Sequence, residues 1–420
     1  MIKKIITAIF SLEAKIAIRR FKPRIVGVTG SVGKSSTKEA IAAVLGSRFN
    51  VRKSMKSYNS ELGLSLAVLD LETAWHSPLG WMKNLWAGLK VFWGKKFPEV
   101  LVLEMGVDRP NDLDRLLKVA KPNIGVVTML GFIPVHVEFF PGPEDVVREK
   151  SKIIKAVPAS GKAILNRDDE ICWDMRELTG AAVISYGFSE NADISASNYK
   201  ISDDGISFKV SMDGANVPVR LHGAYGKQHV YAALAAIAVG SAFDMNLIEM
   251  SEALSLYKSP PGRLKMIEGL KGTRILDDSY NASPLAVTAA LDVLESLQAK
   301  RKIVVLGDML ELGKHTVPQH KAVGQEIAKV ADHLITVGPR TKFTAEEALA
   351  HGMTEKKIAS FSTSREAAKY LEDLIKEGDL ILVKGSQSMR MERVSEALMA
   401  HPEEAFGLLA RQDDFWKKKE

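Results

Sequence analysis

Residues 24–36 read RIVGVTGSVGKSS and place a glycine-rich turn near the start of the chain. An apolar run typical of a strand ends in a glycine-rich turn, and a helical pattern begins after it. Backbone N–H groups and the helix dipole at such a junction stabilise phosphate oxygens, while Lys34 can reach the β and γ phosphates and Ser35 can offer a hydroxyl to Mg²⁺. We therefore interpret it as a nucleotide-binding loop rather than a chance glycine-rich turn, with these contact residues: Gly30, Ser31, Val32, Gly33, Lys34, Ser35 and Ser36.

Strand patterns recur on both sides of a turn at residues 260–263. Those before the turn end at a glycine or polar residue, as in a parallel sheet with crossover helices: EVLVLEMG (99–106), NIGVVTML (123–130) and KAILN (162–166). Residues 187–222 instead alternate polar and apolar positions around Asp-Gly pairs, which predicts antiparallel hairpins. A second strand series follows the turn: RILDD (274–278), KIVVLGD (302–308), HLITVG (333–338) and DLILVKG (379–385).

These patterns predict an α/β protein in three parts. Residues 1–23 form a basic amphipathic helix. Residues 24–264 form a central nucleotide-binding domain, in which a parallel sheet carries the phosphate loop and a small antiparallel β appendage. Residues 265–420 form a Rossmann-like α/β domain.

Composition and charge indicate the cellular compartment but not the substrate. The chain has 420 residues, a hydrophobic fraction of 46% and a net charge of +6, which suits anionic small molecules as well as it suits nucleic acid. Cys172 is the single cysteine, so no intramolecular disulfide can form, and we expect it to be a buried thiol in a reducing cytoplasm. We expect a monomer with no nucleic-acid partner.

Two further side chains follow predicted strands of the first series. Glu104 ends the strand VLVLE, and His136 lies beyond the strand at 123–130. Ligands of open parallel sheets collect at the carboxyl ends of the strands, so we expect Lys34, Glu104 and His136 to converge there.

Eight motifs in order resemble those of the Mur ligase family. They are TGSVGKSSTKE, LEMG, a histidine fourteen residues before the lysine of REKSKII, LNRDD, PGRL, DDSYNASP, LGDMLELG and VKGSQSMRME. The resemblance covers residues 24 to about 400, and its last three motifs resemble the branch that adds D-alanyl-D-alanine. It implies ATP and two Mg²⁺ sites, with Ser35 and Glu104 holding one ion and His136 the other.

The same resemblance implies that Lys150 is carbamylated, which would replace a cation with an anionic oxygen ligand for a hard metal. The alternative is a solvated helix residue beside Lys152 and Lys155. The catalytic set implied is Lys34, Glu104, His136 and Lys150.

Residues around the second domain take weaker roles from the resemblance. Arg263 corresponds to an arginine at the domain junction, Asp278 to a carboxylate that receives the ribose hydroxyls, and Asn281 and Ser283 follow on the same loop. Other residues would face the incoming amine: Lys384, Ser386 and Arg390. Asp308 and Glu311 belong to the LGDMLELG motif, and their alternative role is to cap the helix that follows their strand.

Two departures from the family pattern concern substrate recognition. His229 and Ala232 stand where paired asparagines lie near adenine, and only about two dozen residues precede the phosphate loop, where the family has a UDP-sugar-binding domain. The implied reaction is ATP-dependent amide formation between a UDP-linked muramoyl peptide and D-alanyl-D-alanine. Alternatives are a relative that uses another anionic acceptor, such as a folate-like or lipid-linked one, and a nucleotide-binding scaffold without catalysis.

Two segments have apolar stripes at helical spacing. In residues 1–22 the stripe is Ile5, Ile9, Leu12 and Ile16, which we expect to pack against the protein rather than lie on an anionic membrane. In residues 75–97 the stripe is Trp81, Leu85, Trp86, Leu89, Phe92 and Trp93, with lysines around it. Core packing is the commoner outcome for such a stripe, and a partner or a peripheral membrane contact is the alternative.

Overall fold

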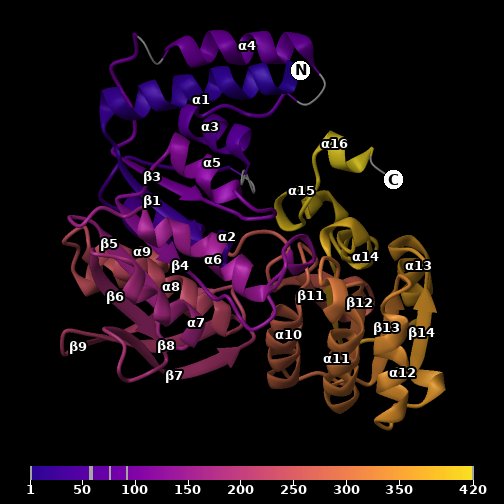
Figure 1. The fold of residues 1–420 in the computed structure, drawn as a ribbon. Coiled ribbons are helices and arrows are strands. Elements are labelled where there is room, and N and C mark those ends of the chain that lie inside the picture. Colours follow the sequence, from indigo (N-terminus) through magenta and orange to yellow (C-terminus); the bar gives the residue numbers. More distant parts are fainter. Residues whose placement is uncertain (1, 56–59, 75–76, 91–92, 419–420) are drawn as a thin grey trace.

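The computed structural model describes residues 2–55, 60–74, 77–90 and 93–418. The chain forms two α/β bodies, each built around one sheet and covered by helices on both faces (Figure 1). Strands of the first sheet are β1 (Arg24–Thr29), β2 (Val51–Lys53), β3 (Val100–Glu104), β4 (Ile124–Val127), β5 (Lys162–Asn166), β6 (Ala182–Gly187), β7 (Ile194–Ser202), β8 (Gly205–Met212) and β9 (Ala215–His222). Those of the second are β10 (Lys265–Gly269), β11 (Thr273–Asp278), β12 (Arg301–Gly307), β13 (His333–Val337), β14 (Ile358–Phe361) and β15 (Asp379–Lys384).

Helices surround each sheet. Those of the first body are α1 (Ile2–Phe21), α2 (Lys34–Gly46), α3 (Glu61–Leu69), α4 (Pro78–Leu89), α5 (Asp112–Val119), α6 (Pro143–Lys155), α7 (Glu170–Trp173), α8 (Lys227–Ser241) and α9 (Leu247–Leu254). Those of the second are α10 (Pro284–Ser296), α11 (Thr316–Val330), α12 (Lys342–Ala350), α13 (Ser364–Leu374), α14 (Glu392–Leu398), α15 (Ala405–Leu408) and α16 (Asp414–Lys417). None of the described helices combines the length and the apolar composition needed to cross a bilayer.

The first sheet confirms the expected mixture of parallel and antiparallel pairing. Its order is β2-β3-β1-β4-β5-β6-β7-β8-β9 in the described part of the chain. Neighbours from β2 to β7 pair in parallel, and β7, β8 and β9 pair antiparallel. The hairpins therefore continue the same sheet. The second sheet has the order β10-β11-β15-β12-β13-β14, in which β10 alone among the described strands is antiparallel.

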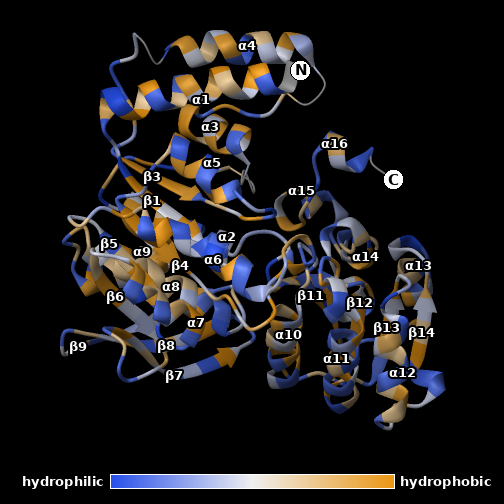
Figure 2. Ribbon diagram, viewed as in Figure 1, coloured by the Kyte–Doolittle hydropathy of each residue, from blue (hydrophilic) through white to orange (hydrophobic). Residues whose placement is uncertain are grey.

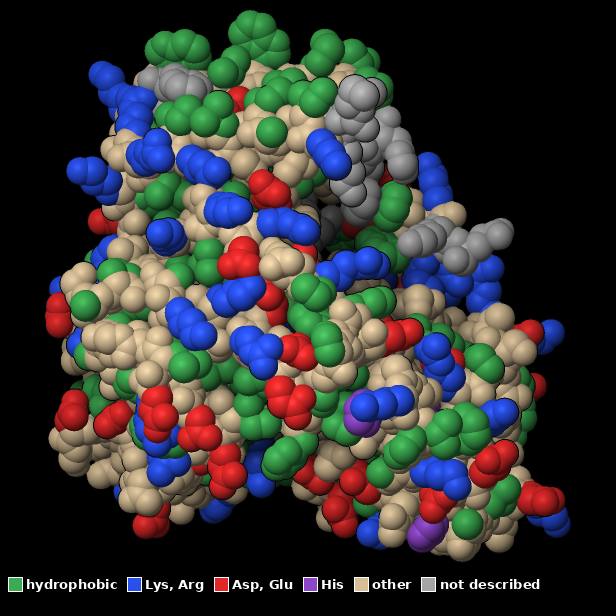
Figure 3. Space-filling view, viewed as in Figure 1, with side chains coloured by type: hydrophobic (Ala, Val, Ile, Leu, Met, Phe, Trp, Pro, Cys, Tyr) green, Lys and Arg blue, Asp and Glu red, His purple; other side chains and the backbone are tan. Residues whose placement is uncertain are grey.

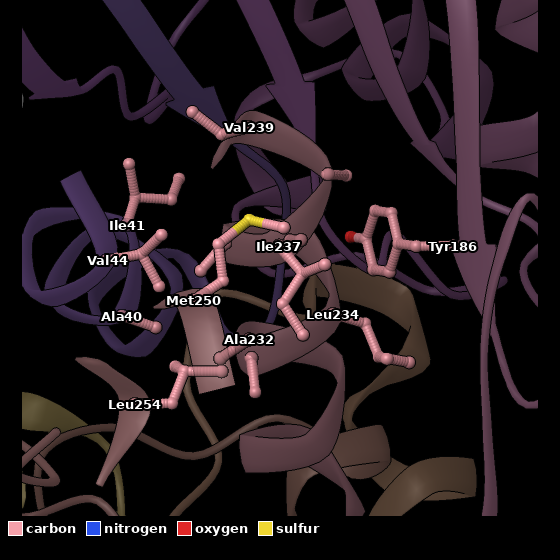
Figure 4. Close-up of a cluster of buried hydrophobic side chains, with 14 of the residues drawn as sticks. Ala40, Ile41, Val44, Tyr186, Ala232, Leu234, Ile237, Val239, Met250 and Leu254 are labelled. Carbon is pink, nitrogen blue, oxygen red and sulfur yellow. The ribbon is translucent and has the colours of Figure 1, made fainter. Parts of the chain in front are cut away.

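Both faces of the first sheet are buried because its central strands are apolar along most of their length. Val26 and Val28 of β1 face a cluster with α2, α8 and α9, whereas Ile25 faces a cluster with α1, α3, α5 and α6. Figure 4 shows the first cluster, in which Ile41 and Val44 of α2 meet Met250 of α9. Hydrophobic residues likewise concentrate in the strands in Figure 2. This packing fixes the carboxyl edge of the sheet, where the site lies.

The expectation that the N-terminal stripe packs against the protein is wrong for three of its four residues, and Ile16 is partly buried. Ile5, Ile9 and Leu12 are exposed, and the helix instead packs through Phe10 and Ala14. The small side chains Ser11, Ala14 and Ala17 lie on the packed side, where the Ser11 and Ser65 hydroxyls are 3.2 Å apart. Helix α1 thus has two apolar faces, and the face with small side chains allows close approach to α3.

The tryptophan segment is divided in the same way. Trp81 packs toward α1, with ring centroids 5.9 Å from Phe10, and Leu85 joins the same cluster. Trp86 and Trp93 are each 74% exposed. Phe92 lies outside the described residues. Core packing is therefore correct for one side of α4 and wrong for the other.

A buried carboxyl between α1 and α4 makes one stability prediction. Glu13 lies against Gly88, where a Cβ would come within 2.1 Å of Glu13 Oε2, and burial raises the pKa of Glu13 from 4.5 to about 7. The folded protein then holds a proton that the unfolded chain has lost, so the free energy of unfolding falls as pH rises from 4.5 to about 7. Glu13→Gln should remove this pH dependence. The melting temperature of the variant minus that of the unchanged protein should therefore increase by several degrees from pH 5 to pH 8.

The control for this prediction is Glu72→Gln, at an exposed position between α3 and α4. Its melting temperature should follow that of the unchanged protein at every pH. Parallel pH profiles for the Glu13→Gln variant and the unchanged protein would contradict the assigned titration.

Candidate active site

The loop between β1 and α2 is held in one shape by left-handed glycines and backbone hydrogen bonds. Gly30 has φ 145° and Gly33 has φ 89°. A Cβ on Gly30 would lie 1.9 Å from Thr128 Oγ1, so no other residue fits there without a shift. The N–H groups of Ser31 and Val32 donate to the Met129 carbonyl at 2.8 and 3.1 Å. The loop therefore leads into the N-terminus of α2, where no described side chain caps the first turn.

Lys34 begins α2 and folds back over this loop. Its Nζ donates to the Gly30 carbonyl at 3.0 Å and to the Ser31 carbonyl at 3.4 Å. Burial lowers the pKa of Lys34, and the charge of Glu104 opposes this shift. The ammonium is thus placed on the loop that would cradle phosphate groups.

Ser35 and Glu104 meet as expected at the carboxyl edge of the sheet. The Ser35 hydroxyl donates to Glu104 Oε2 at 2.9 Å, and Glu104 is buried at the end of β3. The Glu104 N–H donates to Ser54 Oγ, which holds the strand end in place. A hydroxyl and a carboxylate next to a phosphate loop are oxygen donors of the kind that Mg²⁺ prefers. The described residues contain no group of three or more His, Cys, Asp or Glu side chains able to hold a metal, so phosphate oxygens would have to complete the set.

Lys150 is 1% exposed, so the alternative of a solvated helix residue is wrong. Helix α6 points its Nζ at the phosphate loop, where it donates to Ser31 Oγ at 2.8 Å. Burial first and the charge of Lys34 second bring the pKa of Lys150 well below its ordinary value. A lowered pKa favours the neutral amine over the ammonium at this position. The nearby Lys152 instead forms ion pairs with Asp114 and Glu149 at 2.5 and 2.6 Å.

His136 lies between the two sheets, next to acidic side chains that the sequence had not assigned to it. It precedes the short helix η2 (Val137–Phe139) with φ 71°, a left-handed conformation that orients the side chain. Its Nδ1 lies 2.6 Å from Glu311 Oε2, and its Nε2 lies 3.4 Å from Asp108 Oδ1. Burial lowers the pKa of both Lys34 and Lys150, and the charge of Asp108 partly opposes that lowering. Asp108 thus links His136 electrostatically to the loop. Its position four residues after Glu104 was the feature of the sequence that could have placed it in the site.

Asp278, Asn281 and Lys384 lie on the second body, and Arg263 lies at the junction just before it. Asp278 ends β11, where its Oδ2 accepts a hydrogen bond from Lys384 Nζ at 2.5 Å, and Lys384 also donates to the Asn281 carbonyl at 3.0 Å. Burial lowers the pKa of Lys384, and Asp278 opposes the shift. The Arg263 guanidinium lies 4.2 Å from the centroid of the Tyr280 ring, and its charge acts on Lys34.

The residues expected to face an amine are buried and bonded within the second body. Ser386 Oγ accepts from the Leu310 N–H at 2.8 Å, and Arg390 Nε donates to Glu392 Oε1 at 2.5 Å. Ser283 caps α10 by accepting from the Ala286 N–H.

The capping alternative for Asp308 and Glu311 is wrong in detail. Asp308 accepts from the N–H groups of Arg340 and Thr341, both at 2.9 Å, next to α12 and not to the helix that follows its own strand. Glu311 contacts His136.

A cavity of about 490 Å³ lies beside the loop, between the two bodies. His229 and Ala232 do not line it, because they lie on the buried side of α8, where His229 Nδ1 is 2.8 Å from the Tyr257 hydroxyl. Burial lowers the pKa of His229 to about 4. The predicted loop residues Val32 and Gly33 line the cavity, together with residues that the sequence had not indicated: Tyr199, Gln228, Tyr231, Leu285 and Asp292.

Comparisons with known proteins agree with this geometry. Residues 28–240 match the Mur ligase middle domain, and residues 262–387 match the Mur ligase glutamate ligase domain. Two relatives named UDP-N-acetylmuramoyl-tripeptide--D-alanyl-D-alanine ligase are similar over most of the chain. The Bacillus subtilis protein is 29% identical over 93% of this chain and 79% of its own length, and the Escherichia coli protein is 30% identical over 89% and 76%.

Solved structures extend the likeness to the whole fold. MurF ligase from Thermotoga maritima, solved in complex with ADP, is 27% identical with a TM-score of 0.77, covering 93% of this chain and 83% of that one. MurF from Acinetobacter baumannii is 26% identical with a TM-score of 0.78, covering 92% and 79%. The chain belongs to the Mur ligase family.

Proposed function

We propose that this chain is an ATP- and Mg²⁺-dependent ligase that joins D-alanyl-D-alanine to a UDP-N-acetylmuramoyl tripeptide. The observation that carries the proposal is the convergence of Lys34, the Ser35–Glu104 pair and buried Lys150 on one phosphate loop. A nucleotide-binding scaffold would need the loop alone, whereas a buried lysine aimed at that loop has no structural necessity. The names of the Bacillus subtilis and Escherichia coli relatives support the choice of substrates.

In the proposed reaction, an oxygen of the acceptor carboxylate forms a bond to the γ phosphorus of ATP, and the bond from that phosphorus to ADP breaks. The nitrogen of D-alanyl-D-alanine then attacks the acyl phosphate, loses a proton and forms the amide as phosphate leaves. Lys34 and the first N–H groups of α2 would neutralise the charge that spreads over the moving phosphoryl group. Bound Mg²⁺ would supply further neutralisation of the phosphate oxygens.

The residues fit these partners by their chemistry. Ser35 and Glu104 would hold one Mg²⁺, His136 would help to hold a second, and a carbamate on Lys150 would add anionic oxygens. The contact of His136 with Glu311 connects that second position to the C-terminal body. Binding there would respond to how closely the two bodies approach, which is how such an enzyme can exclude water before transfer.

The nucleoside half of ATP would occupy the cavity beside the loop. Tyr231 donates to Asp168 Oδ2 at 2.9 Å, and its ring lies 5.3 Å from that of Phe188 in an edge arrangement, so this wall of the cavity is held rigidly. Tyr199 and Tyr231 can offer apolar ring surface to a base. Asp278 would accept hydrogen bonds from the ribose hydroxyls while it keeps its contact with Lys384. Arg263 and Asn281 would lie next to the phosphates.

An ADP-release assay tests the proposed function directly. Purified chain, ATP and Mg²⁺ should release ADP only when a UDP-muramoyl tripeptide and D-alanyl-D-alanine are both present, with mass spectrometry showing the joined product. ADP release with a folate-like or lipid-linked acceptor in place of the muramoyl peptide would replace the substrate assignment. ATP binding without ADP release for any acceptor would indicate a nucleotide-binding scaffold.

A further inference from the structure

The outer surface of α1 and α4 carries large apolar side chains at helical spacing. Leu79 is 75% exposed, Trp86 74%, Leu12 59%, Met82 55% and Ile5 54%. With Ile9, these residues form what we call the outer apolar face: Ile5, Ile9 and Leu12 on α1, and Leu79, Met82 and Trp86 on α4. Figure 3 shows hydrophobic side chains gathered over the same two helices, which lie side by side in Figure 1. Single exposed apolar residues are ordinary, but a gathered set marks an interaction surface.

The outer apolar face is not needed to hold the two helices in place. Their opposite sides pack on the protein through Phe10 and Ala14 of α1 and through Trp81 and Leu85 of α4. Each helix therefore has a second apolar side beyond the one that the fold uses. An amphipathic helix of a globular protein ordinarily presents polar residues there.

Positive charge is concentrated around this surface. Segments 1–22 and 77–97 contain ten lysines and arginines and one acidic residue, Glu13. Glu13 is buried, so it does not offset the positive charge at the surface. Because the whole chain has a net charge of +6, the remaining residues together carry −3. Eight described members of the basic set are exposed: Lys4, Arg19, Arg20, Lys22, Lys83, Lys90, Lys95 and Lys96.

We propose that the outer apolar face docks on an anionic lipid bilayer, with α1 and α4 lying flat at the headgroup boundary. Tryptophan rings and apolar side chains would enter the boundary region, while the lysines and arginines would contact anionic headgroups. An apolar groove on a protein would match Trp86 and Leu79 but would leave the surrounding basic charge unexplained. The helices form one end of the molecule, so both sheets remain clear of the surface (Figure 1).

Flotation of the full chain with lipid vesicles tests this proposal without any substrate. Vesicles of phosphatidylcholine mixed with phosphatidylglycerol should carry the protein upward. Vesicles of phosphatidylcholine alone should carry at least about tenfold less, because the basic residues lose their counterpart. Raising the salt concentration should weaken binding to the anionic vesicles, since salt screens exposed charges.

A matched pair of variants assigns the binding to this face. The triple variant Leu12→Gln, Met82→Gln, Trp86→Gln should lower the vesicle-bound fraction at least about tenfold. The control Ile248→Gln, Leu256→Gln, Phe406→Gln removes three apolar side chains that are equally exposed elsewhere, and it should float as the unchanged protein does. Circular dichroism and thermal melting verify that both variants fold.

Two results would overturn the proposal. One is that the unchanged protein stays at the bottom of the gradient with anionic vesicles; self-association in sedimentation that the first triple variant abolishes would then assign the face to a second copy of the chain. The other is that the first triple variant floats as well as the unchanged protein.

Discussion

Replacing Lys34 with alanine is expected to lower the rate of product formation at least about a hundredfold while the protein stays folded. Lys34 donates to the Gly30 carbonyl at 3.0 Å, and its charge lies where a transferring phosphoryl group would develop negative charge. The loop itself depends on the glycines and on the Met129 carbonyl, so its shape does not require the lysine side chain. The initial rate of ADP release, measured with saturating ATP, Mg²⁺ and both substrates, reports the loss.

The control for Lys34→Ala is Lys121→Ala, which removes an exposed lysine from the same body. It should leave the rate unchanged and should exclude a general effect of lowering the net charge. Turnover of the Lys34→Ala variant within a few-fold of normal would rule out the role assigned to the phosphate loop.

Local patterns were sufficient to predict the main strands and the loop, but not the edges of the sheets. Strands β1, β3, β4 and β5 are apolar runs that are each followed by a turn. Such runs can be recognised in the sequence because both faces of the sheet are buried there. Four of the described strands were not among those predicted: β2, β6, β10 and β14. Of these, β2, β10 and β14 are edge strands of three to five residues, and β6 is an interior strand whose first three residues are exposed or partly buried. Their position depends on pairing with a neighbour, which the sequence does not display locally.

In the candidate site, contacts within one sheet could be predicted from the sequence, whereas contacts between the two bodies could not. Lys34 and Glu104 were expected to converge because each follows a strand of one parallel sheet. The family resemblance paired Ser35 with Glu104, and the structure places the two side chains 2.9 Å apart. The contact of His136 with Glu311 could not be predicted, because it depends on how the two bodies approach each other. The cavity wall formed by Tyr199 and Tyr231 also combines residues from a strand and a helix.

Helical periodicity identified the amphipathic segments but could not decide which stripe faces inward. Helix α1 offers one stripe with Ile5 and Leu12 and another with Phe10 and Ala14, and the structure buries the second. Small residues allow the closest approach of a neighbouring helix, so packing against α3 outweighs the larger apolar area of the first stripe. Which stripe of α1 is buried therefore depends on the shape of α3 and not on the stripes of α1 alone.

Replacing Lys150 with alanine is expected to abolish turnover, and a short carboxylic acid added to the assay should restore part of it. The Lys150 side chain is 1% exposed with its Nζ 2.8 Å from Ser31 Oγ, and its pKa is lowered by burial and by Lys34. A neutral amine there can attack CO₂ and lose a proton to become a carbamate. That anion would face the positive charge of Lys34 and offer oxygen to a hard cation, whereas an ammonium would repel both.

Three measurements separate a carbamate from a lysine that only fills space. ¹³C-labelled bicarbonate should give a carbamate resonance in the unchanged protein that is absent from the Lys150→Ala variant. The control Lys152→Ala removes a lysine paired with Asp114 and Glu149 on the same helix, and it should keep both the resonance and the activity. Rescue by the carboxylic acid should appear with Lys150→Ala and be absent with Lys34→Ala, because a carboxylate can substitute for a carbamate but not for an ammonium. Full activity of Lys150→Ala, or an unmodified amine under saturating bicarbonate, would leave burial at the loop as the only function of this lysine.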